Sequence, residues 1–283
     1  MLQFGLRLGD DPQQLVTTTP RPIPIIKRLV VQSGTVVTRG ATHENATNLA
    51  PSFMGEMKRR YEGTRLGRQE LAGEIMDDVP GALWTRAVLD DKRVTAEKLP
   101  DMQRVVVAID PAVTSGQDNE GNAETGIVCV GLGVDGRGYV LDDGSCRLSP
   151  NGWARRAVAL YDRHSADRIV GETNQGGEMV RQTVRSVRDT VSFVGVHASR
   201  GKVTRAEPIS ALYEQGRISH VGAFPELEDQ MVLFTVNGIE GDTTADRVDA
   251  LVWALTDLFP QMVKRKVVDL NEGVSGGGSW LGA

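Results

Sequence analysis

The chain has 283 residues, 40% of them hydrophobic and 24% charged, which is a composition typical of a globular protein. Its formal net charge of −5 gives no overall basic character, so any nucleic-acid binding must depend on a local patch. The sequence has neither an apolar run of about 20 residues nor a signal peptide, and its two cysteines lack metal-binding spacing, so we expect a cytoplasmic protein without a membrane span or a structural zinc site.

The first 80 residues are rich in arginine, threonine and proline. A strand is predicted at 15–19, where apolar and β-branched residues precede three closely spaced prolines. A helix is predicted to begin at Pro51 and to continue to Tyr61. Residues 81–100 combine a tryptophan with a charged run, and we interpret them as a linker to a second unit.

The second unit begins with strands. An unbroken apolar run at 105–109 ends on Asp110 and predicts a strand that is buried on both faces. Residues 126–134 and 139–141 flank an Asp-Gly turn and predict an antiparallel hairpin. The first three strands of this unit are therefore expected to be antiparallel.

Helices and strands then alternate. The predicted elements are a helix from Pro150, a strand at 168–172, a helix at 178–189, a strand at 191–196 and two helices, the second at 244–259. This order predicts an α/β ribonuclease H-like fold over residues 101–262, with a mixed sheet in which parallel strands follow the three antiparallel ones, flanked by helices. The glycine-rich tail, 263–283, is predicted to be flexible.

Carboxylates end two of the predicted strands. In this fold the first and fourth strands are parallel neighbours, so Asp110 and Glu172 should lie side by side at the edge of the sheet where ligands bind. The late helix must deliver a third carboxylate, from Asp246 or Asp249, which share a helical face because they are three residues apart. The pattern alone does not decide between these two.

This set of hard oxygen donors suits Mg²⁺ or Mn²⁺, and two such ions about 4 Å apart can promote phosphodiester hydrolysis. Clustered carboxylates repel one another, so the arrangement would cost stability if it held no metal. Each residue also has a plainer explanation as a turn residue, a solvated strand end or a helix-start acid. In the loop after Asp110, the acids Asp118, Glu120 and Glu124 are more often solvent-facing, although Glu124 is near enough to a strand to approach the metals.

Five stretches resemble the nuclease domain of terminase large subunits from tailed phages, prophages or gene-transfer-agent-like elements. They are VAIDPA at 107–112, ETGI at 124–127, GETNQGG at 171–177, KVTRA at 202–206 and DRVDALVWA at 246–254. They occur in the order seen in that family and span about residues 100–260.

The resemblance implies roles for individual residues. It makes Asp110, Glu172 and Asp249 the catalytic metal ligands and places Asp246 where it can also bind metal. It further implies that Lys202 and Arg205 line a DNA groove, although a solvated basic loop would explain them too. Arg181 and Arg185 are predicted on one helical face and could contact phosphates or simply form a solvated face.

The N-terminal part resembles the end of the packaging ATPase domain of the same family, at FGLRLG (4–9), VTTTPRP (16–22) and TNLA (47–50). The resemblance implies that Thr17, Thr18 and Thr19 belong to the segment that couples nucleotide state to movement. The sequence has no GxxxxGK[ST] phosphate loop and no apolar strand ending in an acidic pair. We therefore expect residues 1–80 to be the C-terminal remnant of a P-loop-type ATPase domain in a chain truncated upstream, without ATP hydrolysis.

The leading expectation is a metal-dependent endonuclease that cuts concatemeric double-stranded DNA during packaging. The resemblance implies double-stranded DNA, a portal protein and a small terminase subunit as partners, and a ring of copies on the portal. A resolvase or transposase of the same fold is one alternative. Another is an inactive motor fragment that only binds DNA or the portal.

Overall fold

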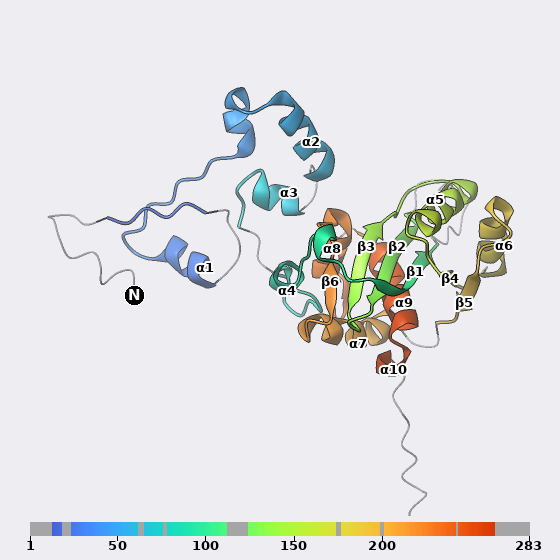
Figure 1. Cartoon of the computed structure of the whole chain (residues 1–283). Coiled ribbons are helices and arrows are strands. Elements are labelled where there is room, and N and C mark those ends of the chain that lie inside the picture. The colour runs from blue at the N-terminus through green and yellow to red at the C-terminus, as the bar shows by residue number, and fades with distance from the viewer. Residues whose placement is uncertain are drawn as a thin grey trace, which may run out of the picture.

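A six-stranded mixed sheet forms the core of the part of the protein that follows the N-terminal helices (Figure 1). In a computed structural model of the chain, the described residues are 13–18, 24–61, 65–75, 78–111, 124–173, 177–198, 201–241 and 243–263. The strand order is β5-β4-β1-β2-β3-β6. The strands are β1 (Met102–Asp110), β2 (Gly126–Gly133), β3 (Gly138–Asp143), β4 (Arg168–Glu172), β5 (Phe193–Val196) and β6 (Ile218–His220).

The strand pairing confirms the predicted mixed sheet. β1, β2 and β3 are consecutive antiparallel neighbours, and β4 lies parallel to β1 and to β5. β6 pairs in parallel with β3 and was not predicted from the sequence. The hairpin between β2 and β3 turns at Gly136, whose φ of +75° is a conformation that glycine adopts readily.

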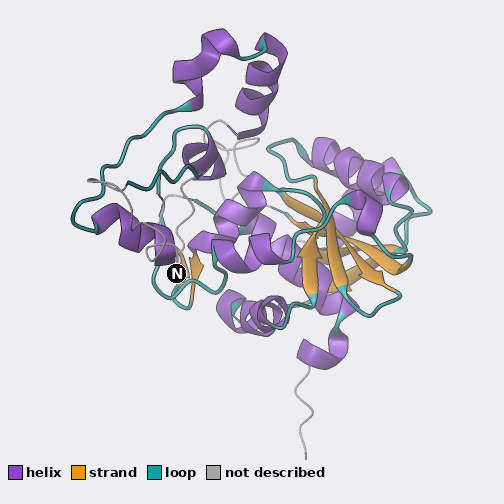
Figure 2. Ribbon diagram, turned by 60° about the vertical axis from the view of Figure 1, so that its left-hand side comes forward, coloured by secondary structure: helices purple, strands orange, loops and turns teal. Residues whose placement is uncertain are grey.

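Helices cover both faces of this sheet (Figure 2). One face carries α5 (Pro150–Arg163) and α6 (Gly177–Val187), and the other carries α7 (Lys202–Glu214), α8 (Pro225–Leu233) and α9 (Asp246–Leu258). Side chains alternate between the two faces along a strand, so Val106 packs towards α9 while Val107 packs towards α5. Burial on both faces explains why β1 is a continuous apolar run.

The described N-terminal residues are mainly helical. They form α1 (Pro24–Val31), the 3₁₀ turn η2 (Thr42–Asn48), α2 (Pro51–Tyr61), α3 (Arg65–Glu70), α4 (Arg86–Asp91) and the 3₁₀ turn η3 (Ala96–Lys98). The helix predicted from Pro51 to Tyr61 is confirmed. The strand predicted at 15–19 is wrong for residues 15–18, which form no regular secondary structure; Thr19 lies outside the described residues.

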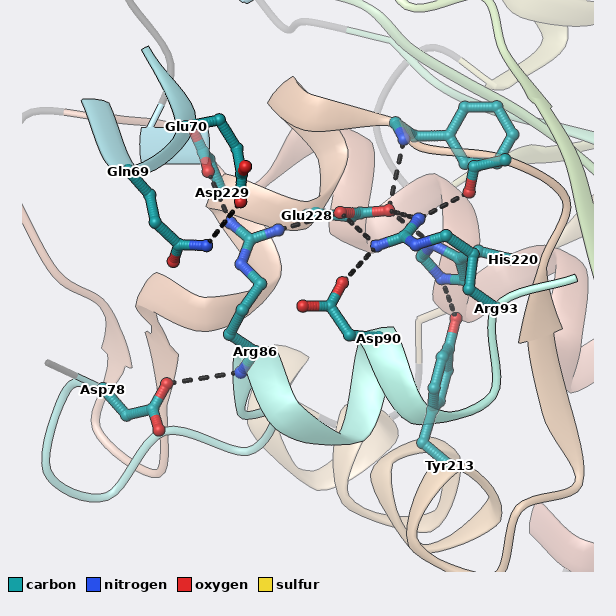
Figure 3. A network of polar contacts seen from close by, with 12 residues as sticks. Gln69, Glu70, Asp78, Arg86, Asp90, Arg93, Tyr213, His220, Glu228 and Asp229 are labelled. Atoms are coloured by element: carbon teal, nitrogen blue, oxygen red, sulfur yellow. Dashed lines mark hydrogen bonds and ion pairs between the residues drawn. The ribbon is translucent and has the colours of Figure 1, made fainter. Parts of the chain in front are cut away.

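The segment interpreted as a linker packs against the sheet domain. Trp84 and Leu89 are both 1% exposed, and the Trp84 ring contacts the rings of Tyr213 on α7 and Phe234 after α8. A buried polar network continues this contact, because Arg86 and Arg93, from α4 and the turn after it, both bind Glu228 on α8 (Figure 3). Residues 84–93 therefore belong to the packing of this domain.

Three further points complete the fold. Two helices were predicted between β5 and residue 259, with bounds only for the second, whereas the described residues form three there, α7, α8 and α9. The short strands β7 (Phe234–Thr235) and β8 (Gly238–Ile239) form a small separate hairpin after α8. The helix α10 (Pro260–Val263) ends the described part, so residues 264–283 of the predicted tail lie outside it. No helix in the described part is both long enough and apolar enough to cross a membrane.

Candidate metal centre

Two carboxylates end neighbouring parallel strands. Ile109 on β1 pairs with Gly171 on β4, so Asp110 and Glu172 each follow a paired residue at the same edge of the sheet. Asp110 is 8% exposed, and the Glu172 side chain is partly buried. This is the side-by-side arrangement that the sequence predicts.

The first turn of α9 brings two more carboxylates to this edge. Gly126, the first residue of β2, pairs with Asp110. A Cβ atom on Gly126 would lie 1.9 Å from the carbonyl oxygen of Asp246, so glycine is required for α9 to begin against β2. Asp249, one turn further along α9, is 2% exposed. The start of α9 therefore adds Asp246 and Asp249 to Asp110 and Glu172.

The four carboxylates repel one another electrostatically. Burial raises the pKa of Asp110 well above its usual value, and the negative charges of Asp249, Glu172 and Asp246 raise it further. Burial also raises the pKa values of Asp246 and Asp249. Burial and mutual repulsion thus disfavour the charged forms of these carboxyl groups, and a bound cation would favour them.

Two basic side chains from α7 partly balance this charge. Lys202 Nζ lies 2.5 Å from Asp249 Oδ2, and the Lys202 side chain is 54% exposed. Burial alone would lower the pKa of Lys202, but the charges of Asp249, Asp110 and Asp246 and the hydrogen bond to Asp249 raise it. Arg205 is buried, with Nη1 3.7 Å from Glu172 Oε2 and Nη2 3.8 Å from Asp249 Oδ1. Both predicted DNA-binding residues of this segment thus lie at the carboxylate cluster.

The donors of this cluster fit a hard divalent cation in chemistry and charge, because four carboxylates offer oxygen ligands and excess negative charge. With the side chains where they lie, however, no three histidine, cysteine, aspartate or glutamate side chains of the described residues are arranged to hold one ion. Asp249 is turned towards Lys202 and Arg205 instead. A bound cation would therefore have to compete with the Lys202 ammonium group for Asp249.

Glu124 lies beside this cluster but is bound by other residues. Its Oε1 and Oε2 accept hydrogen bonds from Arg247 at 2.9 and 3.0 Å, and Oε2 also accepts one from Gln230 at 2.9 Å. Gln230 Oε1 accepts a bond from the backbone N–H of Arg247, and Arg247 Nη1 donates to Asp143. This network fixes the start of α9. The acids Asp118 and Glu120 lie outside the described residues.

The other predicted site residues lie elsewhere. Arg181 and Arg185 are on α6, on the opposite face of the sheet from α9, where Arg181 lies over the ring of Phe193 at 5.7 Å and Arg185 is exposed. Thr17 and Thr18 are exposed in the N-terminal part. Their predicted roles in phosphate contact and in coupling stay predictions.

One residue of the site was not assigned a role from the sequence. Trp253 Nε1 donates a hydrogen bond to Glu172 Oε2 at 3.2 Å. The signal for it was present, because Trp253 follows Asp249 by four residues and so shares its helical face. A buried tryptophan on an apolar helix is otherwise indistinguishable from a core residue.

Two family models match the chain. A model described as the terminase RNase H-like domain matches residues 107–258, more than half of the chain. A model of the N-terminal part of the terminase large subunit, T4-like-virus type, matches residues 1–90. No curated protein matches the sequence.

Solved phage terminase structures are similar at low sequence identity. The nuclease domain of the P22 large terminase has a TM-score of 0.47 and 13% identity, with 65% of this chain and 94% of that chain covered. The large terminase nuclease of the thermophilic phage G20c with bound magnesium has 0.43 and 14%, with 63% and 98% covered. The nuclease domain of the large terminase subunit of bacterial virus Sf6 has 0.45 and 13%, with 62% and 98% covered.

Proposed function

The chain belongs to the terminase large subunit family, and on that premise we propose that it is a metal-dependent endonuclease that cuts concatemeric double-stranded DNA during viral genome packaging. The observation that carries the proposal is the meeting of Asp110, Glu172, Asp246 and Asp249 at one edge of the sheet, where burial and mutual repulsion raise the pKa of Asp110.

In this proposal Asp110, Glu172 and Asp249 are the catalytic ligands, and Asp246 contributes to the same cage. Two Mg²⁺ or Mn²⁺ ions bound there would supply an activated water and stabilise the attacking and leaving oxygens of the phosphodiester. The chain itself fixes the carboxylates on β1, β4 and α9. These rigid elements keep the ligands in place and limit the reorganisation needed for reaction.

Basic residues contribute the DNA contacts. Lys202, whose side chain is 54% exposed, would contact a phosphate next to the carboxylates. Arg205 is buried against Glu172 and Asp249, so its contribution to a DNA groove is mainly through the electrostatic field at the site. Arg181 and Arg185 on α6 would meet DNA only if the duplex extended to the other face of the sheet.

The proposal includes a biological setting. We propose that the protein acts in the host cytoplasm with double-stranded DNA, a portal protein and a small terminase subunit, in a ring of copies on the portal. Residues 17–19 would take part in coupling nucleotide state to movement. The sequence contains no phosphate-loop motif, so we assign no ATP hydrolysis to this chain.

Cleavage of plasmid DNA tests the proposal. The purified chain is incubated with supercoiled plasmid and Mn²⁺ or Mg²⁺, and we expect nicked and linear products that disappear with EDTA. Asp110→Ala and Glu172→Ala should abolish cleavage, whereas Asp91→Ala, which changes an exposed acid of α4, should not.

Three outcomes would contradict the proposal. If Asp110→Ala and Glu172→Ala cleave as well as the unaltered chain, the catalytic assignment is overturned. Activity restricted to branched DNA or RNA–DNA hybrids would favour a resolvase or another ribonuclease H-like enzyme. Portal binding without any metal-dependent cleavage would indicate an inactive motor fragment.

A further inference from the structure

Trp253 makes a directional contact with one of the proposed metal ligands. It lies one helical turn after Asp249 on α9 and is 4% exposed. Its indole N–H donates to Glu172 Oε2, with 3.2 Å between the nitrogen and the oxygen. Because an indole has one donor and no acceptor, this bond uses the whole polar capacity of the side chain. The contact joins α9 to the end of β4.

The face of the same indole holds Arg205. The guanidinium carbon of Arg205 lies 4.2 Å from the centre of the Trp253 ring, which is the geometry of a cation–π contact. Arg205 Nη1 is 3.7 Å from Glu172, and Nη2 is 3.8 Å from Asp249. Both distances are too long for direct hydrogen bonds. Arg205 is therefore held between two carboxylates by ion pairs without direct hydrogen bonds, and by stacking on the indole.

The burial of Arg205 makes this support necessary. Arg205 is 9% exposed, and its Nε and Nη1 atoms are buried without a hydrogen-bond partner. Hydrogen bonds of these two atoms therefore do not set the orientation of the guanidinium group. Its plane is set by the indole ring on which it stacks. The indole N–H thus contacts Glu172 directly, and the indole ring fixes the positive charge of Arg205 between Glu172 and Asp249.

We propose that Trp253 is a positioning residue of the metal centre, which orients the Glu172 carboxylate by its N–H and fixes Arg205 between Glu172 and Asp249 by its ring. The inference rests on the proposed function. Groups that orient metal ligands typically change metal affinity by about 10- to 100-fold when they are removed. Replacing a core tryptophan without this role would change the stability of the protein but leave its metal affinity unchanged.

Calorimetric titration of the full chain with MnCl₂ tests the inference without relying on cleavage. Trp253→Phe removes the N–H while keeping an aromatic ring, and we expect the Mn²⁺ affinity to fall by about 10- to 100-fold. Trp84→Phe is the matched control. Trp84 is 1% exposed, in the same core, and its N–H is buried without an acceptor, so the same change should leave Mn²⁺ affinity as it was.

A second variant covers the case in which Trp253→Phe folds poorly. Site-specific replacement of Trp253 by benzothienylalanine exchanges the N–H for a sulfur atom and keeps the size of the two rings. We expect the same loss of Mn²⁺ affinity, and a higher Mn²⁺ concentration for half-maximal plasmid cleavage with little change in rate at saturating Mn²⁺.

The outcomes separate this inference from the proposed function. Unchanged Mn²⁺ affinity in both Trp253 variants, with normal binding by the unaltered chain, would overturn the inference alone. An equal loss in Trp84→Phe would also overturn it, because the effect would then be one of general core packing. Absence of Mn²⁺ binding by the unaltered chain would overturn the proposed function and this inference with it.

Discussion

Two clusters of buried carboxylates in this domain differ in how far basic groups neutralise their charge. In the first, Glu228 on α8 is 0% exposed and accepts hydrogen bonds from Arg86, Arg93, His220 and the backbone N–H of Phe224 (Figure 3). In the second, the Asp110 carboxyl lies among three other acids with Lys202 and Arg205 nearby. Both clusters connect elements that are distant in sequence.

The pKa values of Glu228 and Asp110 are shifted in opposite directions by their surroundings. Burial alone would raise the pKa of Glu228, but hydrogen bonds from His220 and Arg93 lower it well below its usual value. The pKa of Asp110 is raised by burial and raised again by the charges of Asp249, Glu172 and Asp246, which Lys202 only partly opposes. A carboxylate whose charge is fully paired within the chain holds structure together. A set of carboxylates left short of positive charge is suited to binding a cation from outside.

Asp110→Asn should separate activity from stability most clearly. It removes a proposed metal ligand, and since bound metal contributes several kcal/mol to transition-state stabilisation, plasmid cleavage should fall on the order of 10³-fold. The free energy of unfolding in EDTA should not fall, because repulsion with Asp249, Glu172 and Asp246 is relieved. Urea denaturation beside a cleavage assay measures both. A large loss of stability with retained cleavage would reverse the roles assigned to the two clusters.

Glu228→Gln should show the opposite pattern. It leaves Arg86 and Arg93 facing a neutral group in a buried site, and removing one partner of a buried ion pair costs about 3 kcal/mol of stability. Mn²⁺ affinity should stay the same wherever the variant is folded. Glu226→Gln, a change on the first turn of the same helix, is the control and should leave the unfolding free energy within about 0.5 kcal/mol. If the two variants have the same free energy of unfolding, the network in Figure 3 makes no specific contribution to stability.

Acid should weaken the Glu228 network. Its pKa is lower in the folded chain than its usual value of 4.5, so the folded state resists protonation and the stabilisation is fully present above about pH 4.5. It is lost as the pH falls below that value, by up to about 1.4 kcal/mol per pH unit for one proton. Comparing Glu228→Gln with Glu226→Gln between about pH 3 and 6, by urea denaturation, isolates this contribution. Parallel pH profiles for the two variants would show that Glu228 does not titrate abnormally.

The arrangement of the proposed ligands was predictable because its signals are local. Asp110 and Glu172 each end an apolar run, and strand ends that are parallel neighbours meet at one edge. The choice between Asp246 and Asp249 was not decidable, because both fit the helical pattern. The structure shows Asp249 buried against Lys202 and Asp246 less buried, with both within electrostatic range of Asp110. Their catalytic roles stay predictions.

The Glu228 network could not be predicted, because the two arginines that bind Glu228 lie far from it along the chain. Glu228 is 142 residues from Arg86. The bounds of its helix, α8, were not predicted because Glu228 and Gln230 are buried polar residues, which hide the apolar face that would mark an amphipathic helix. The strand β6 was missed for a related reason, since Ser219 and His220 are polar yet buried. Long-range pairing of polar groups leaves no periodic signal in the sequence.

Gly126→Ala tests how closely the carboxylate cluster depends on the packing of α9 against β2. The new Cβ would overlap the carbonyl oxygen of Asp246, so the first turn of α9 must move away from β2. Because the overlap is with backbone atoms, this overpacking should cost about 3 kcal/mol of stability, the upper end of its usual range. Because the shift displaces Asp246 and Asp249 relative to Asp110, Mn²⁺ affinity should fall about 10-fold. Gly55→Ala on α2, where a Cβ meets no atom within 4 Å, should not change Mn²⁺ affinity.

The Glu228 network should be unaffected by Gly126→Ala, because that network does not involve β2. The loss of stability in acid that is assigned to Glu228 should therefore persist in this variant. Loss of both properties together would show that the two clusters form one cooperative unit, and unchanged Mn²⁺ affinity would show that the contact between α9 and β2 does not set the spacing of the ligands.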